Sequence, residues 1–169
     1  MLLDEPRQAL SIRWRGRGPD DLHARYPRAG DPMLVLPRHA ELLPVAGSGL
    51  VMTFHSRSVN GFRAEVLPAG LSLPAMMWNG SRRVLEEVDL TPFQDAPAES
   101  RGGAFETYAR LARIGGHPRW LQGDGSLPDY RYVAHLPMAS IGIDDGNPFD
   151  VYILLHQSNR RARVVVQVC

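Results

Sequence analysis

Glycine and proline interrupt this chain so often that it has little room for long helices. The sequence contains 16 glycines and 14 prolines among its 169 residues, a share well above the usual ~12%. Short apolar or alternating segments lie between these breaks. This pattern favours many short strands joined by turns over a bundle of long helices.

The clearest alternating segment covers residues 11–17. Ile12 and Trp14 point one way, and the polar residues point the other. A period of two is typical of a half-buried strand. We therefore predict a strand whose exposed face carries Ser11, Arg13, Arg15 and Arg17.

The other expected strands are the segments 33–36, 50–55, 62–67, 130–136, 151–156 and 163–168. Asn60-Gly61 lies between two of them, and Gln157 to Arg160 joins the last two. Such short connections are typical of hairpins, so we expect the sheet to be antiparallel.

Helix is expected in few places. Residues 82–90 fit a helix capped by Ser81, although Val84, Glu86 and Val88 also alternate as in a strand; we favour the helix. Residues 104–114 have helical spacing and end at Gly115-Gly116, and residues 37–43 fit one short helical turn. The predicted fold is α+β, mainly antiparallel sheet with one or two short helices, in a single domain over 1–169 or in two β-rich halves, about 1–100 and 101–169.

Composition excludes several classes of protein. The net charge of +1 is too small for a general nucleic-acid binder, and no apolar run approaches the ~20 residues of a membrane span. Cys169 is the only cysteine, so no intrachain disulfide or cysteine-based zinc site can form. We expect a cytoplasmic protein without nucleic-acid or membrane partners.

Catalytic and metal-binding patterns do not stand out. The six histidines lack zinc-site spacing, and the chain has no lysine, which removes Schiff-base chemistry. No nucleotide-binding loop or Gly-x-Ser-x-Gly elbow occurs. We expect no metal, no cofactor and no enzymatic activity.

Acidic residues concentrate between positions 84 and 106, where six acids face one arginine. A solvated surface explains such a segment, but concentrated charge also steers association with a partner. The predicted partner-binding residues are Glu86, Glu87, Asp89, Asp95, Glu99, Arg13, Arg15 and Arg17, and a cationic toxin domain is the candidate partner.

The segment from Gly115 to Asp124 is the most unusual part of the sequence. Two glycines allow the chain to reverse, and Trp120 can bury a large ring, so the segment fits a rigid structural corner. The alternative is a small-ligand or catalytic site, because arginine binds anions and histidine exchanges protons near neutral pH. The alternative site residues are His117, Arg119, Gln122 and Asp124.

The string Gly115-Gly116-His117-Pro118-Arg119-Trp120-Leu121-Gln122 resembles the signature of the YwqG-like family, a bacterial family of uncharacterised function. The expected strands after it follow in the corresponding order, so the resemblance covers residues 114–156. It implies an α+β fold of β-rich halves and no established catalytic residues. Some relatives carry cysteines shortly after the motif, where this chain has Leu127-Pro128-Asp129-Tyr130, so no metal function is implied.

Together these features predict a non-enzymatic protein-binding module, most specifically a bacterial immunity protein that neutralises a toxin by occlusion. Two alternatives stay open. One is a small-ligand-binding protein or enzyme that uses the Gly115–Asp124 corner, and the other is a self-associating scaffold domain of an envelope or secretion assembly.

Overall fold

The computed structural model describes residues 5–20, 25–96, 111–143 and 149–168. Ten strands occupy about half of these residues, and neighbouring strands pair antiparallel throughout. In chain order the strands are β1 (Arg7–Trp14), β2 (Pro32–Pro37), β3 (Gly49–Phe54), β4 (Phe62–Leu67), β5 (Met76–Asn79), β6 (Val84–Asp95), β7 (Arg113–Gly115), β8 (Tyr130–Pro137), β9 (Phe149–His156) and β10 (Ala162–Val168).

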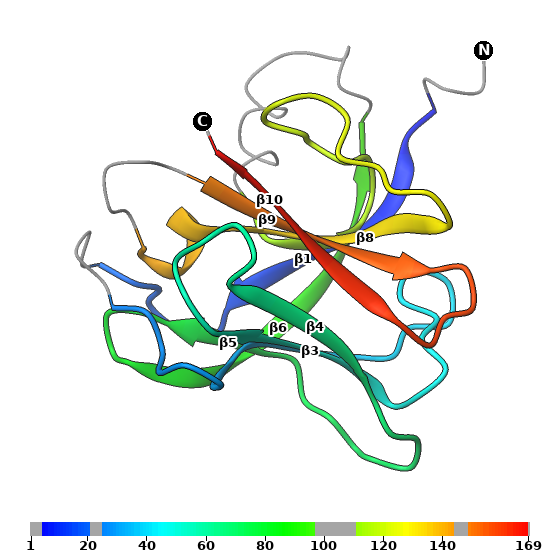
Figure 1. Ribbon diagram of the computed structural model, residues 1–169. Helices are drawn as coiled ribbons and strands as arrows, with labels where there is room; N and C mark the ends of the chain where they lie inside the picture. The colour runs from blue at the N-terminus through cyan, green and yellow to red at the C-terminus, as the bar shows by residue number, and fades with distance from the viewer. Residues whose placement is uncertain (1–4, 21–24, 97–110, 144–148, 169) are drawn as a thin grey trace.

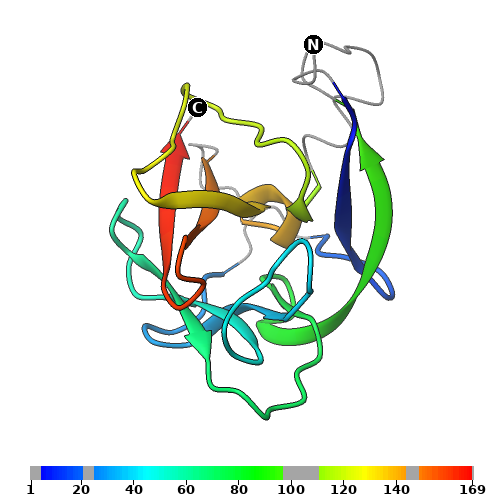
Figure 2. The same cartoon turned by 90° about the vertical axis from the view of Figure 1, so that its right-hand side faces the viewer.

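All ten strands belong to one sheet, in the order β10-β9-β8-β7-β1-β6-β5-β2-β3-β4. The sheet curls until its two edge strands, β4 and β10, lie beside each other (Figure 1, Figure 2). No ladder joins these two strands over the described residues. The result is a nearly closed ten-stranded barrel.

The longest strand, β6, connects the two parts of the sheet. Its first residues pair with β5, with Glu87 opposite Met76, and its later residues pair with β1, with Val88 opposite Trp14. Because one continuous strand takes part in both ladders, the amino-terminal and carboxy-terminal strands share one sheet.

The core fills the inside of this curled sheet. Residues from nearly every strand contribute, among them Ile12, Leu34, Met52, Leu136 and Ile153, each at most 3% exposed. Apolar side chains on the inner face of each strand supply the main stabilisation of such a fold.

The α+β prediction is wrong, because the regular secondary structure in the described part of the chain is almost entirely antiparallel β-sheet. Its helical element is the single 3-10 turn η2 (Met138–Ile141). Residues 37–43 form no helical turn: Pro37 ends β2, and a bridge between His39 and Leu43 closes a tight loop.

Residues 82–90, where we favoured a helix, belong largely to β6. Ser81 caps no helix, since the side chain of Asn79 accepts hydrogen bonds from the N–H groups of Ser81 and Arg82 and forms a turn there. Val88 of this segment is buried within the strand. Two partner strands were available to satisfy the extended backbone, and tertiary pairing overrides weak helical spacing.

The helix predicted for 104–114 lies mainly outside the described residues. Its last two positions belong to strand β7, which pairs with β1. The other predicted strands and both predicted hairpins are present, with bounds that differ by a few residues. Strands β5 and β7 were missed. No helix in the described part of the chain is long and apolar enough to cross a membrane.

Candidate functional site

The predicted acidic and basic surfaces lie on neighbouring strands, where they neutralise each other. Arg13 on β1 is directly opposite Asp89 on β6. Arg15 lies 2.6 Å from Glu87 Oε2 through Nη1 and 2.9 Å from Asp89 Oδ1 through Nε. The bond to Asp89 is the main cause that raises the pKa of Arg15. Glu87 and Asp89 are therefore paired with an arginine of the same chain.

The remaining residues of this predicted surface have local partners as well. Glu86 binds Arg82 at 2.9 Å, and Arg17 lies 3.6 Å from Asp20. Arg13 Nε donates to Ser11 Oγ at 2.9 Å, and Ser11 is buried, not exposed as predicted. Glu99 lies outside the described residues.

Asp95 differs from the other acids because it is completely buried. Its Oδ1 accepts a hydrogen bond from Arg119 Nη2 at 2.7 Å, and its Oδ2 accepts one from the His117 N–H, also at 2.7 Å. Burial, opposed by the charge of Asp95, lowers the pKa of Arg119. Asp95, which was predicted to bind a protein partner, thus holds His117 and Arg119, which belong to the predicted small-ligand site.

His117 and Arg119 share Asp95, but the other contacts of the four corner residues go to different partners. The His117 ring lies 3.0 Å from the carbonyl of Glu5, and Arg119 also donates to the carbonyl of Ala96. Gln122 Oε1 accepts from the Val168 N–H at 3.3 Å, and Asp124 accepts from Ser126. That bond to Ser126 lowers the pKa of Asp124. These contacts fix a loop and do not bring the four side chains onto one ligand.

We call residues 116–126 the corner loop. Gln167 on β10 holds it through three hydrogen bonds, accepting from the N–H groups of Leu121 and Gln122 at 2.7 and 3.0 Å and donating to the carbonyl of Gly123 at 2.9 Å. Trp120 packs against Tyr152, with ring centroids 4.6 Å apart. The corner loop is therefore anchored to the carboxy-terminal end of β10.

A buried histidine lies behind this loop. His135 stacks on Tyr152, with ring centroids 4.4 Å apart, and its Nε2 lies 2.6 Å from Asp150 Oδ2. Burial lowers the pKa of His135 and raises the pKa of Tyr152. Both side chains are therefore neutral at pH 7. No three histidine, cysteine, aspartate or glutamate side chains gather in a metal-binding arrangement within the described ranges.

The edge strands β4 and β10 lie side by side without a ladder between them in the described part of the chain, and we call the space between them the seam. In an antiparallel ladder, successive residues turn their backbone groups alternately toward and away from a given neighbour. The His156 N–H donates to the Arg161 carbonyl at 2.8 Å, so Arg161 turns its backbone groups toward β9. Every second residue after Arg161 does the same, and the residues between them turn their backbone groups toward the seam. The residues of β10 that turn their N–H and C=O groups toward the seam are Ala162, Val164 and Val166.

The same reasoning applies to β4. The His55 N–H donates to the Gly61 carbonyl at 2.7 Å, so Gly61 and every second residue after it turn their backbone groups toward β3. Phe62, Ala64 and Val66 then turn their backbone groups toward the seam. The two strands thus face each other with rows of backbone donors and acceptors that enter no ladder in the described part of the chain.

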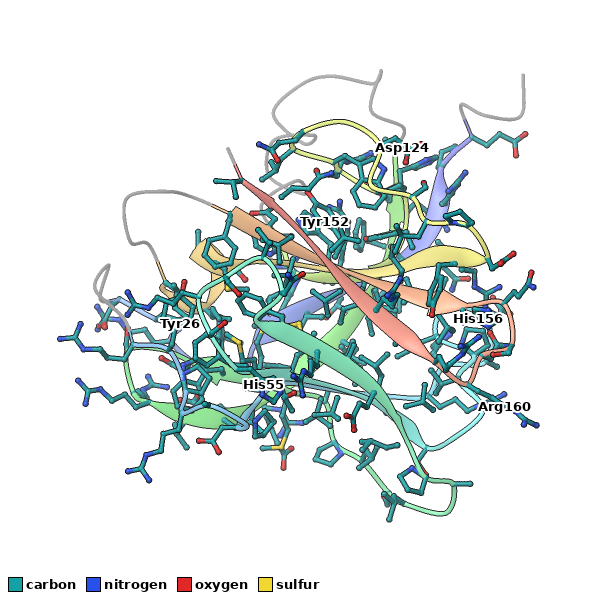
Figure 3. The ribbon with its side chains drawn as sticks, in the orientation of Figure 1. Tyr26, His55, Asp124, Tyr152, His156 and Arg160 are labelled. Carbon is teal, nitrogen blue, oxygen red and sulfur yellow. The ribbon has the colours of Figure 1, made fainter. Side chains whose placement is uncertain are left out.

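Two hollows follow the seam, of about 590 and 660 Å³. They share Ala64 and Glu65 of β4 and Ala162 and Arg163 of β10, so they form one continuous groove. Four exposed arginines and one glutamate line it, a net charge of +3, from Arg63, Glu65, Arg160, Arg161 and Arg163. Arg160 points away from the sheet at the hairpin between β9 and β10 (Figure 3).

Sequence reasoning missed the seam because its two walls are about 100 residues apart in the chain. Both strands were predicted, but nothing local shows that they become the two ends of one sheet. The available signal was the group of three arginines, Arg160, Arg161 and Arg163, in the predicted 157–168 hairpin.

Comparison with known proteins gives no relative. No protein-family model matches the chain, and neither a curated protein nor a solved structure matches it.

Proposed function

We propose that this protein is a non-enzymatic protein-binding module that recognises its partner at the seam between β4 and β10. The observation that carries the proposal is the pair of adjacent sheet edges whose backbone groups enter no ladder, beneath a rim of exposed arginines. An open edge is a template for an added strand.

Several properties of β10 support this reading. Natural proteins usually protect edge strands with proline, a bulge or a short length. β10 is seven residues long, contains three consecutive valines, and pairs with β9 in regular register. Such a strand has the β-branched composition that favours pairing.

Within this class, we propose the specific form of an immunity protein of the bacterial cytoplasm that neutralises a toxin by occlusion. The kinship with the YwqG-like family, suggested by the string from Gly115 to Gln122, belongs to the same proposal. The cationic toxin predicted from the acidic segment gains no support from the described geometry, because Glu86, Glu87 and Asp89 pair with arginines of the same chain, Arg82 and Arg15.

The experiment compares two surfaces of the same protein. The purified chain is mixed with the product of a toxin-like neighbouring gene, and complex formation is measured by calorimetry together with protection of cells that express the toxin. Arg163→Glu places a reversed charge in the seam, and Arg17→Glu makes the same change at an exposed position just beyond the end of β1, a strand in the middle of the sheet.

We expect Arg163→Glu to weaken the complex and the protection, and Arg17→Glu to leave both unchanged. The reverse result would move the interface to the charged face of β1 and β6. If the wild-type chain forms no complex, the binding function itself is wrong.

A further inference from the structure

The basic rim of the seam, its backbone alternation and the corner loop together specify what kind of segment can bind there. This inference rests on the proposed function and extends it to the chemistry of the partner. Three questions decide it: which edge pairs with the partner, how long the available edge is, and which charge the partner carries.

The edge of β10 is better suited to an added strand than the edge of β4. Arg160, Arg161 and Arg163 lie at or just before the start of β10, whereas β4 carries Arg63 together with Glu65. The Arg163 guanidinium lies over the Tyr130 ring at 5.8 Å, which helps to hold it beside the groove.

The corner loop limits the length of this edge. The next seam-facing N–H after Val166 is that of Val168, and Gln122 Oε1 already accepts its hydrogen bond. The Gln122 side chain therefore occupies the place of a neighbouring strand at that position. An added strand has Ala162, Val164 and Val166 available, enough to pair with about five residues of an extended segment.

An added strand also has to displace β4 locally. Cα atoms of β4 and β10 approach within 8 Å of each other, and a third strand between two neighbours needs about 9.6 Å. Since no ladder joins β4 to β10, widening the seam breaks side-chain contacts but no β4–β10 ladder bond.

The charge of the groove selects the partner. Its net +3 attracts an acidic segment and disfavours a basic one. A second copy of β10 is a poor occupant, because it would bring arginines of its own into a groove that is already positive. Arginines on an edge are also a known protection against pairing between identical strands.

We propose that the seam binds an extended acidic segment of a protein partner, which adds to β10 as a strand at Ala162, Val164 and Val166. The acidic side chains of the segment contact the rim arginines. Its apolar side chains pack against the groove beside Phe62 and Ala64 of β4, which line it.

The test uses a heptapeptide in which glutamate and valine alternate, with blocked ends. Binding to the full chain is measured at low and high salt, and amide hydrogen exchange is followed residue by residue. One control peptide has lysine in place of glutamate. A second keeps the acidic sequence but carries N-methyl groups on alternate backbone nitrogens, on the side that would face β10.

We expect the acidic peptide to bind, with an affinity that falls as salt rises, and neither control peptide to bind. The amides of Ala162, Val164 and Val166 should gain protection. The amides of Arg163 and Val165 should not change, because they already donate to β9. Arg163→Glu should lower the affinity for the acidic peptide about tenfold, because one favourable charge contact is lost and a repulsive one is gained.

Val164→Pro provides a second test, because it removes a seam-facing N–H and leaves the ladder to β9 intact. It should abolish peptide binding while thermal unfolding stays cooperative. If it does not fold, the N-methylated peptide still decides the question. Binding of the lysine peptide, equal binding of the N-methylated peptide, or no binding of the acidic peptide would each overturn the proposal.

These outcomes are separate from failure of the proposed function. A toxin complex that is lost in Arg163→Glu but leaves the seam-facing amides unprotected would keep the function and overturn strand addition. If none of the seam variants weakens the toxin complex, the proposed binding function at the seam is wrong.

Discussion

Asp95 on β6 and Arg119 in the corner loop form a buried ion pair, with 2.7 Å between Asp95 Oδ1 and Arg119 Nη2. The sequence placed these residues in two different predicted sites, one for a cationic partner and one for a small ligand. In the structure they are partners, and their side chains are 0% and 5% exposed. Their contact joins the end of β6 to the corner loop.

Asp95→Asn should destabilise the protein strongly. The substitution leaves the Arg119 guanidinium buried without its counter-charge, and breaking a buried pair in this way costs about 3–5 kcal/mol. The measurement is urea unfolding followed by tryptophan fluorescence. Asp89→Asn is the matched control, since it removes the same charge from an exposed pair with Arg15 and should change the free energy of unfolding little. Equal effects of the two substitutions would contradict the assigned role of Asp95.

Stability should fall as the solution becomes acidic because of His135. Its pKa in the folded protein is lowered from the usual 6.5 by burial, so the unfolded chain binds the proton more readily. The neutral form contributes its full stability above about pH 6.5, and this contribution is lost below that pH by up to ~1.4 kcal/mol per pH unit.

His135→Gln tests this prediction. Glutamine retains an N–H that can donate to Asp150 but does not titrate. Urea unfolding between about pH 8 and pH 5 should give a shallower decline in the variant than in the wild type. Parallel declines in the two proteins would show that His135 does not control the acid sensitivity.

Gly116 and Gly123 provide a comparison within the corner loop. Both have a positive φ, +76° and +93°, which an L-residue adopts at a cost of roughly 1–2 kcal/mol. An added Cβ at Gly116 would lie 2.6 Å from Asp95 Oδ2, whereas at Gly123 it would meet nothing within 4 Å. Gly116→Ala should therefore lower the melting temperature clearly more than Gly123→Ala. A similar loss in both would mean that the contact with Asp95 relaxes easily.

The sequence predicted most strands of this fold but not its class, and particular segments show why. Phe62 to Leu67 was located to the residue, because alternation and the neighbouring Asn60-Gly61 agree. Residues 84–90 satisfied both helical and strand spacing. Only the presence of β1 and β5 on either side decided in favour of a strand, and that is a property of the folded chain.

The candidate site was less predictable for a related reason. Local sequence shows that Glu87 and Asp89 are acidic, but not that Arg15, more than 70 residues away, pairs with both. It shows that Gln122 is polar, but not that its amide covers one end of β10. The local count of charges therefore predicted a partner-binding surface. In the folded protein, the pairing of β1 with β6 brings Arg15 next to Glu87 and Asp89, which it neutralises.

Gln167 should be the residue that keeps the corner loop on β10. Gln167→Leu removes one acceptor shared by two N–H groups and one donor. Because Leu121 to Gly123 are exposed, water can replace part of these bonds, and the expected loss is about 1–3 kcal/mol. Faster hydrogen exchange at the amides of Leu121 and Gln122 is the specific measurement, since a general loss of stability would speed exchange throughout the sheet.

Gln157→Leu, at an exposed position in the β9–β10 hairpin, should leave these amides unchanged. If Gln167→Leu leaves them unchanged too, the loop is held instead by the packing of Trp120 on Tyr152.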